Sequence, residues 1–196
     1  YGTEQEGSEL TKKYLHSNYP LLVKEVVGRL WREKSASQYY ELIEETPLQE
    51  GIEEFFIELS RLREKNSGEQ SIQVVLLTSG PFELAERIKK LFPFDFVFAN
   101  QLVIKNGIVT GEFLWPVGAG TNQKVTLLQQ LCDDLEMPIS DVFTIGDGDA
   151  DFELFCVAGF SVAFCAHSER LRNAASVVVD KPDLREVIPI LRTIIQ

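Results

Sequence analysis

The chain has 196 residues, of which 44% are hydrophobic, so it can fold around a sizeable core and is not a disordered polar segment. Its 30 acidic and 19 basic residues give a net charge of −11, which argues against nucleic acid or an anionic membrane as the main partner. No apolar run approaches the roughly 20 residues that a membrane-spanning helix needs.

The first 45 residues have the apolar spacing of helices, as at Leu22, Val26, Val27 and Leu30, and an amphipathic helix is expected after Gly51. From residue 72 the pattern changes. The apolar run at 72–79 predicts a strand that is buried on both faces of a parallel sheet. A helix is expected over 80–92.

Strands and helices then alternate to the end of the chain. The patterns predict a strand at 94–100, a hairpin at 101–115 turning at Asn106-Gly107, a helix at 122–137, a strand at 141–147, a short helix at 150–159, strands at 160–166 and 175–180, and a closing segment at 184–195. This alternation predicts an α/β fold with a mainly parallel sheet.

The cysteines are Cys132, Cys156 and Cys165, an odd number with no CxxC spacing. They indicate neither a disulfide framework nor a zinc site. The first ten residues also lack the basic and apolar pattern of a signal peptide. We therefore expect small buried thiols and a cytoplasmic protein.

Polar residues follow two of the predicted strands, at the edge where open parallel sheets bind ligands. Thr78, Ser79 and Gly80 end the strand at 72–79 and precede a helix. A hydroxyl and free backbone N–H groups at a helix start can bind phosphate. An ordinary N-cap serine would give the same pattern, so both interpretations stay open.

The segment VFTIGDGDADFELF, residues 142–155, places Asp147, Asp149 and Asp151 after a buried strand. Carboxylates at a strand end suit Mg²⁺, which prefers oxygen ligands and would offset their repulsion. The alternative is a solvated acidic turn, which fits Asp149, whereas a metal site needs Asp147 and Asp151. Lys124 opens the preceding helix, where a cation opposes the helix dipole unless a carboxylate or phosphate lies nearby. An exposed lysine is the alternative.

Taken together and in this order, these motifs resemble the phosphoserine phosphatase branch of the haloacid dehalogenase superfamily. The similarity runs from about Thr46 to the end, through TPLQEGIEEF, VVLLTSG, FDFVFANQLVIKNGIVTG, GTNQK, IGDGDADFEL, AGFSVAFCA and DLREVIPIL. It implies a Rossmann-like α/β core at residues 46–196 and a small helical cap at residues 1–45.

The resemblance also implies a Mg²⁺-dependent phosphomonoester hydrolase that acts on a small phosphorylated metabolite. Ser79 and Gly80 would bind the transferring phosphoryl group, and Lys124 would neutralise its charge. Asp147 would be a Mg²⁺ ligand, while Asp151 would position Lys124 and support the metal shell. Ser79, Lys124 and Asp151 are thus the predicted catalytic residues.

The chain departs from the family pattern at three places. Pro81 replaces the second glycine of SGG and removes an N–H donor, and Ala150 replaces the usual asparagine before the second acid. The motif DxDx[TS], which supplies the nucleophile and a general acid, does not occur in the 196 residues. We expect it upstream of Tyr1, on a central strand between those ending at Ser79 and Asp147. Without that strand, buried backbone groups would be unpaired, each at a cost of about 1–3 kcal/mol.

Other functions remain open at this point. A catalytically inactive relative that binds a phosphorylated ligand or a protein partner would explain the missing motif. A phosphotransferase or a dehalogenase has the same fold. Glu4, Glu6 and Arg29 are candidates for the substrate-selecting residues of the family's cap. No oligomeric state is predicted.

Overall fold

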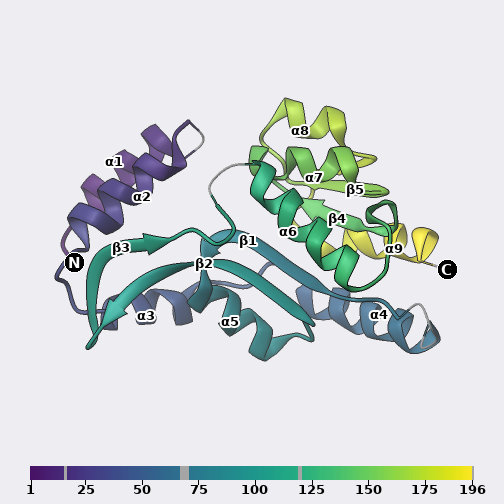
Figure 1. Ribbon diagram of the computed structural model, residues 1–196, viewed down its shortest axis with the longest axis horizontal. Helices are drawn as coiled ribbons and strands as arrows, with labels where there is room; N and C mark the ends of the chain where they lie inside the picture. Colours follow the sequence, from purple (N-terminus) through teal and green to yellow (C-terminus); the bar gives the residue numbers. More distant parts are fainter. Residues whose placement is uncertain (16, 67–70, 119–120, 196) are drawn as a thin grey trace. The chain divides into compact units, whose positions relative to one another are not determined.

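The chain forms two compact units, each assembled from two separate stretches of sequence. A computed structural model describes residues 1–15, 17–66, 71–118 and 121–195. Unit 1 comprises residues 1–46 and 75–119, and unit 2 comprises residues 47–74 and 120–196 (Figure 1). The division into a cap at 1–45 and a core at 46–196 stays a prediction.

Unit 1 begins with the predicted helical segment. Its elements are α1 (Glu4–Tyr14), α2 (Tyr19–Glu25), the π-helical turn η1 (Val26–Leu30), α3 (Ser37–Glu45), β1 (Val75–Pro81), α5 (Phe82–Leu91), β2 (Phe96–Lys105) and β3 (Ile108–Leu114). Helix α2 begins where the Asn18 side chain accepts a hydrogen bond from the Leu21 N–H, with Pro20 in the first turn. Figure 1 shows α3 and α5 beside β1 and β2, and α1 and α2 beside β3.

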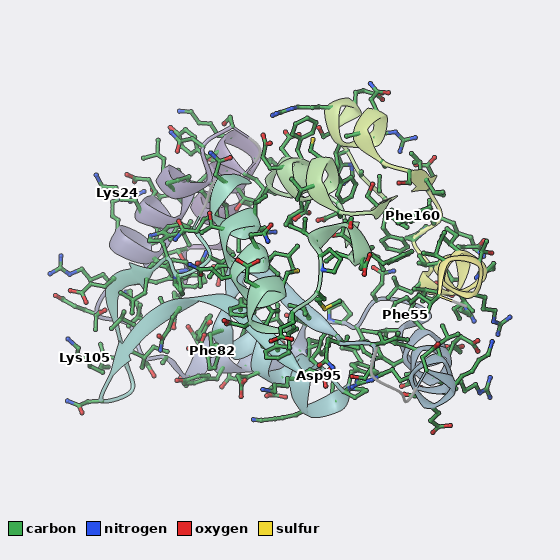
Figure 2. All side chains as sticks on the ribbon, turned by 45° about the vertical axis from the view of Figure 1, so that its right-hand side comes forward. Lys24, Phe55, Phe82, Asp95, Lys105 and Phe160 are labelled. Carbon is green, nitrogen blue, oxygen red and sulfur yellow. The ribbon has the colours of Figure 1, made fainter. Side chains whose placement is uncertain are left out.

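The sheet of unit 1 has the order β1-β2-β3. Strands β1 and β2 are parallel, and β2 and β3 form the predicted antiparallel hairpin. Asn106 and Gly107 turn the hairpin with φ of 52° and 74°, as a type I′ turn requires. Figure 2 shows Lys105 at this end of the hairpin. The strand expected at 94–100 and the first arm of the hairpin expected from residue 101 form one continuous strand, β2, because no turn residue separates them.

Strand β1 differs from its prediction in burial and regularity. Its residues are half-buried throughout, whereas burial on both faces was expected. In the part of the chain that the structure describes, β1 pairs only with β2, so its other edge has no strand beside it. The pairing with β2 is regular from Val75 to Leu77 and resumes at Pro81. Thr78, Ser79 and Gly80 lie in this irregular interval.

Unit 2 contains the remaining elements. They are α4 (Ile52–Lys65), α6 (Thr121–Asp134), the 3₁₀ turns η2 (Ile139–Asp141), η3 (Asp149–Asp151) and η4 (Leu184–Val187), β4 (Phe143–Gly146), α7 (Phe152–Val157), β5 (Phe160–Phe164), α8 (Glu169–Ala174), β6 (Val177–Val179) and α9 (Ile188–Ile194). Its strands form a parallel sheet in the order β4-β5-β6. With one antiparallel pair among four, the two sheets confirm the predicted α/β class with mainly parallel pairing.

Helix α4 is attached to the end of the chain within unit 2. Figure 1 shows α4 and α9 close together, and Arg192 on α9 donates to both carboxylate oxygens of Glu58 at 2.7 and 2.8 Å. Gly51 precedes α4 with φ of +76°, and a Cβ there would lie 2.4 Å from Asp183 Oδ1. Glycine is therefore required at residue 51 both by its backbone conformation and by the close approach of Asp183.

The three cysteines are free, as predicted, but only Cys132 is buried. Cys156 is exposed on α7 and Cys165 is half-buried, so the expectation of buried thiols is wrong for these two. None of the helices in the described ranges is long and apolar enough to cross a membrane.

Candidate active site

The irregular end of β1 holds the predicted phosphate-binding segment in unit 1. The Gly80 N–H donates to Thr78 Oγ1 at 3.0 Å, so an oxygen acceptor already lies in front of this donor. Pro81 has extended backbone angles and is the N-cap of α5, which explains why a proline fits there. The segment thus presents a backbone N–H and a hydroxyl at the start of a ten-residue helix.

The Ser79 hydroxyl is the most unusual group in this segment. Its Oγ is buried and has no hydrogen-bond partner among the residues that the structure describes. A buried hydroxyl without a partner costs on the order of 1–3 kcal/mol, so such groups are rare in folded proteins. This observation favours a ligand as the missing partner over the simple N-cap interpretation of Ser79.

The backbone carbonyl of Ser79, by contrast, is well held. It accepts from Asn100 Nδ2 at 3.0 Å and from the Tyr19 hydroxyl at 3.4 Å. Burial raises the pKa of the Tyr19 phenol, so this hydroxyl stays protonated and remains a donor at neutral pH. The peptide that follows Ser79 is therefore fixed from its carbonyl side.

In unit 2, Lys124 and Asp151 form a buried ion pair. Lys124 Nζ lies 2.7 Å from Asp151 Oδ1, and the two residues are only 5% and 8% exposed. The nearby carboxylate inferred from the position of Lys124 at a helix start is present, and the exposed-lysine interpretation is wrong. A buried pair of this kind requires both partners, because either charge alone would be uncompensated.

The other oxygen of Asp151 faces the end of β4. Asp151 Oδ2 accepts from the backbone N–H groups of Asp147 and Gly148 at 3.3 and 3.5 Å. A Cβ on Gly146 would lie 2.7 Å from the Asp151 carboxylate, so glycine permits this close approach. The acid is thereby held between Lys124 and the turn that carries Asp147.

Asp147 and Asp149 have different surroundings although both are exposed. Asp149 accepts a hydrogen bond from Ser168, the N-cap residue of α8, which agrees with a role in the turn. Among the residues that the structure describes, the Asp147 carboxylate has no hydrogen bond or ion pair. Within the described ranges no group of three or more His, Cys, Asp and Glu side chains gathers as a metal site. Mg²⁺ commonly uses one or two protein carboxylates with water and substrate phosphate, so Asp147 fits such a ligand set.

The candidate cap residues lie in unit 1 on the surface. Arg29 is 2.6 Å from Glu6 and 2.7 Å from Glu25, and about half of its side chain is exposed. These contacts raise the pKa of the Arg29 guanidinium, with the hydrogen bond to Glu25 contributing most. Glu4 is exposed in the first turn of α1. Any role of these residues in substrate selection stays a prediction.

Asn100, which ends the predicted strand at 94–100, was not among the predicted site residues. It is completely buried and makes hydrogen bonds to backbone groups around Ser79 and Val117. A polar amide at the end of an apolar run is the signal that would have drawn attention to it. Ser79 and Gly80 belong to unit 1, whereas Lys124, Asp147 and Asp151 belong to unit 2.

Comparison with known proteins identifies the family. The family model for haloacid dehalogenase-like hydrolases matches residues 4–155, well over half of the chain. The chain belongs to this family. The match includes Ser79, Gly80, Lys124, Asp147 and Asp151, all of which lie within the matched range.

Within the haloacid dehalogenase-like hydrolases, the chain is similar to phosphoserine phosphatases. That of Methanocaldococcus jannaschii is 29% identical over 204 residues, covering 97% of this chain and 86% of the relative. That of Campylobacter jejuni subsp. doylei is 32% identical over 161 residues, covering 80% and 71%. A solved structure of a phospho-aspartyl intermediate analogue of phosphoserine phosphatase matches with a TM-score of 0.82 at 28% identity, covering 96% of this chain and 86% of that one.

These similarities confirm the predicted family branch and its Rossmann-like core. They support an enzyme of the haloacid dehalogenase phosphatase type. The alternative of a catalytically inactive binding domain is not favoured by them.

Proposed function

We propose that this protein is a Mg²⁺-dependent phosphomonoester hydrolase of the cytoplasm, acting on a small phosphorylated metabolite such as phosphoserine. The observation that carries the proposal is the buried Ser79 Oγ, just before helix α5, for which the described residues supply no hydrogen-bond partner. A phosphoryl oxygen would supply the acceptor that this hydroxyl lacks. The phosphoserine phosphatases named above support the substrate class, and free cysteines agree with the proposed compartment.

The proposed roles follow from charge and hydrogen-bonding capacity. Ser79 Oγ and the Gly80 N–H donate to phosphoryl oxygens, and the ammonium of Lys124 offsets their negative charge. Asp151 holds Lys124 through the 2.7 Å ion pair. Asp147 holds Mg²⁺, which when bound neutralises negative charge on carboxylates and the phosphoryl group. These groups act by positioning and electrostatics, as phosphoryl transfer requires.

The covalent step needs an aspartate nucleophile of the DxDx[TS] type, which the 196 residues do not contain. One carboxylate oxygen attacks phosphorus while the bond from phosphorus to the alcohol oxygen breaks, and the general acid of the same motif protonates that oxygen so that it leaves as the alcohol. Water then hydrolyses the acyl phosphate, which releases inorganic phosphate and restores the carboxylate. The full-length gene product is therefore the material for any assay of turnover.

The test measures phosphate release from a panel of phosphomonoesters that includes phosphoserine, with and without Mg²⁺. We expect Mg²⁺-dependent turnover, a loss on the order of 100-fold for Asp147→Asn, and near-normal activity for Asp149→Asn. Asp149 is the matched control because it lies in the same turn and bonds Ser168 instead. Absence of turnover on every ester by the folded, full-length protein would refute the proposed function.

A further inference from the structure

Asn100 on β2 is a buried amide whose hydrogen-bonding groups are nearly all used. It has no exposed surface. Its Nδ2 donates to the Ser79 carbonyl at 3.0 Å and to the Gly118 carbonyl at 2.9 Å. Its Oδ1 accepts from the Val117 N–H at 3.0 Å. Both donor hydrogens of the amide and one of its two acceptor lone pairs are thus engaged.

This amide acts where strand pairing is absent. The register between β1 and β2 is interrupted between Leu77 and Pro81, so within the described ranges Ser79 and Gly80 have no β2 residue paired with them in the ladder. Asn100 is the β2 residue opposite Pro81, at the point where pairing resumes. The Nδ2 group of its side chain donates to the Ser79 carbonyl, in place of the backbone N–H that a regular ladder would provide.

The direction of the Gly80 N–H follows from this contact. The Ser79 carbonyl and the Gly80 N–H belong to one planar trans peptide, so they point in opposite directions. A donor that fixes the carbonyl on one side fixes the N–H on the other. That N–H donates to Thr78 Oγ1 at 3.0 Å, which shows that it can serve as a donor to an oxygen acceptor.

The same amide holds a second turn of unit 1. Val117 and Gly118 precede helix α6 in the chain, and Gly118 has φ of +73°, which glycine adopts without strain. One side chain therefore fixes two backbone segments that strand pairing leaves free, and both adjoin sequence motifs with proposed roles in phosphate chemistry.

We propose that Asn100 is a positioning residue for phosphoryl binding, because its buried amide orients the Ser79–Gly80 peptide so that the Gly80 N–H faces the phosphoryl group. This inference rests on the proposed function of Ser79 and Gly80. A purely structural amide would contribute to stability alone. The proposed role requires in addition that the folded protein loses affinity for phosphate when the amide donors are removed.

The decisive variant is Asn100→Asp, which keeps the shape of the side chain and the acceptor for Val117 but replaces the two donors by an oxygen. Binding of inorganic phosphate in the presence of Mg²⁺ is measured by titration calorimetry on the full-length protein. The measurement is made at a temperature where circular dichroism shows each variant folded. We expect the dissociation constant to rise about tenfold or more, equivalent to about 1.4 kcal/mol.

Two further variants separate the possible outcomes. Asn100→Ser has a neutral, smaller side chain that keeps one O–H donor. If Asn100→Asp does not fold, Asn100→Ser is the test, and we expect a smaller rise in its dissociation constant for phosphate. Ser161→Ala is the control, because Ser161 is 2% exposed and hydrogen-bonded to Ser176 in the sheet of unit 2. It should lower the melting temperature and leave phosphate affinity unchanged.

Phosphate affinity equal to that of the parent in the folded Asn100 variants would overturn the positioning role and leave the proposed function standing. If the parent itself does not bind phosphate, or if Ser79→Ala binds it equally well, the proposed function fails and this inference fails with it. The inference is supported if the dissociation constant for phosphate rises in the Asn100 variants and does not rise in Ser161→Ala.

Discussion

The ion pair between Lys124 and Asp151 gives the sharpest quantitative prediction. The Nζ–Oδ1 distance is 2.7 Å, which corresponds to a Coulomb attraction of about 6 kcal/mol at an effective dielectric constant of about 20. Desolvation of two residues that are 5% and 8% exposed offsets much of this gain. Removing one partner leaves the other charge buried, so Lys124→Met should lower the free energy of unfolding by about 3–5 kcal/mol.

The assay is urea denaturation followed by circular dichroism, in EDTA and without phosphate, for the parent, Lys124→Met, Asp151→Asn and the double variant. The double variant has no unpaired buried charge. Its loss in free energy of unfolding should therefore be about 2 kcal/mol smaller than the sum of the two single losses. Glu186→Gln is the control, because it disrupts the exposed pair with Lys181 at 2.6 Å and should have a far smaller effect. Additive losses in the cycle would refute a coupled buried pair.

Two further predictions concern unit 2. Gly51→Ala should lower the free energy of unfolding by about 2 kcal/mol or more, since φ is +76° and the new Cβ would meet Asp183 at 2.4 Å. Gly107→Ala, at φ of +74° with open space around it, should cost only about 1 kcal/mol, and equal losses in urea would contradict the steric argument. The hydrogen bonds from Arg192 lower the pKa of Glu58 from 4.5 to about 2. A carboxyl whose pKa is lower in the folded state stabilises the protein above the unfolded pKa, and this contribution is lost as pH falls from about 4.5 towards 2. The melting temperature of the parent should therefore fall more steeply over that range than that of Arg192→Gln, and parallel curves would contradict the linkage.

Much of the site was predictable because Ser79 and Asp147 end apolar runs that form strands, and Lys124 opens a helix. A lysine at a helix start is unfavourable with the helix dipole, and an acid crowded among other acids is unfavourable by repulsion. An ion pair between the two offsets both effects. The helix-start position of Lys124 suggested a nearby carboxylate or phosphate, and the family resemblance identified Asp151 as the partner that the structure shows.

Other features left only a weak pattern in the sequence. The position of Asn100 at the end of an apolar run marks the residue, but its partners are backbone groups of Ser79, Val117 and Gly118, which have no sequence signature. The irregular interval of β1 was missed because apolar periodicity shows that a strand exists and does not show where its pairing breaks. Helix α8 has six residues with one buried apolar side chain, Leu171, which is too short a segment to show a helical period.

The interleaved course of the chain has a consequence for dissecting the protein. The backbone passes from one unit to the other three times, so neither unit corresponds to one continuous fragment. A chain cut after residue 119 would retain every part of unit 1 but would also carry α4 without η4 and α9. The face of α4 that buries Phe55, Leu59 and Leu62 would then be exposed to water. Truncated fragments should therefore be prone to aggregation, and domain-by-domain expression is a poor route to either half.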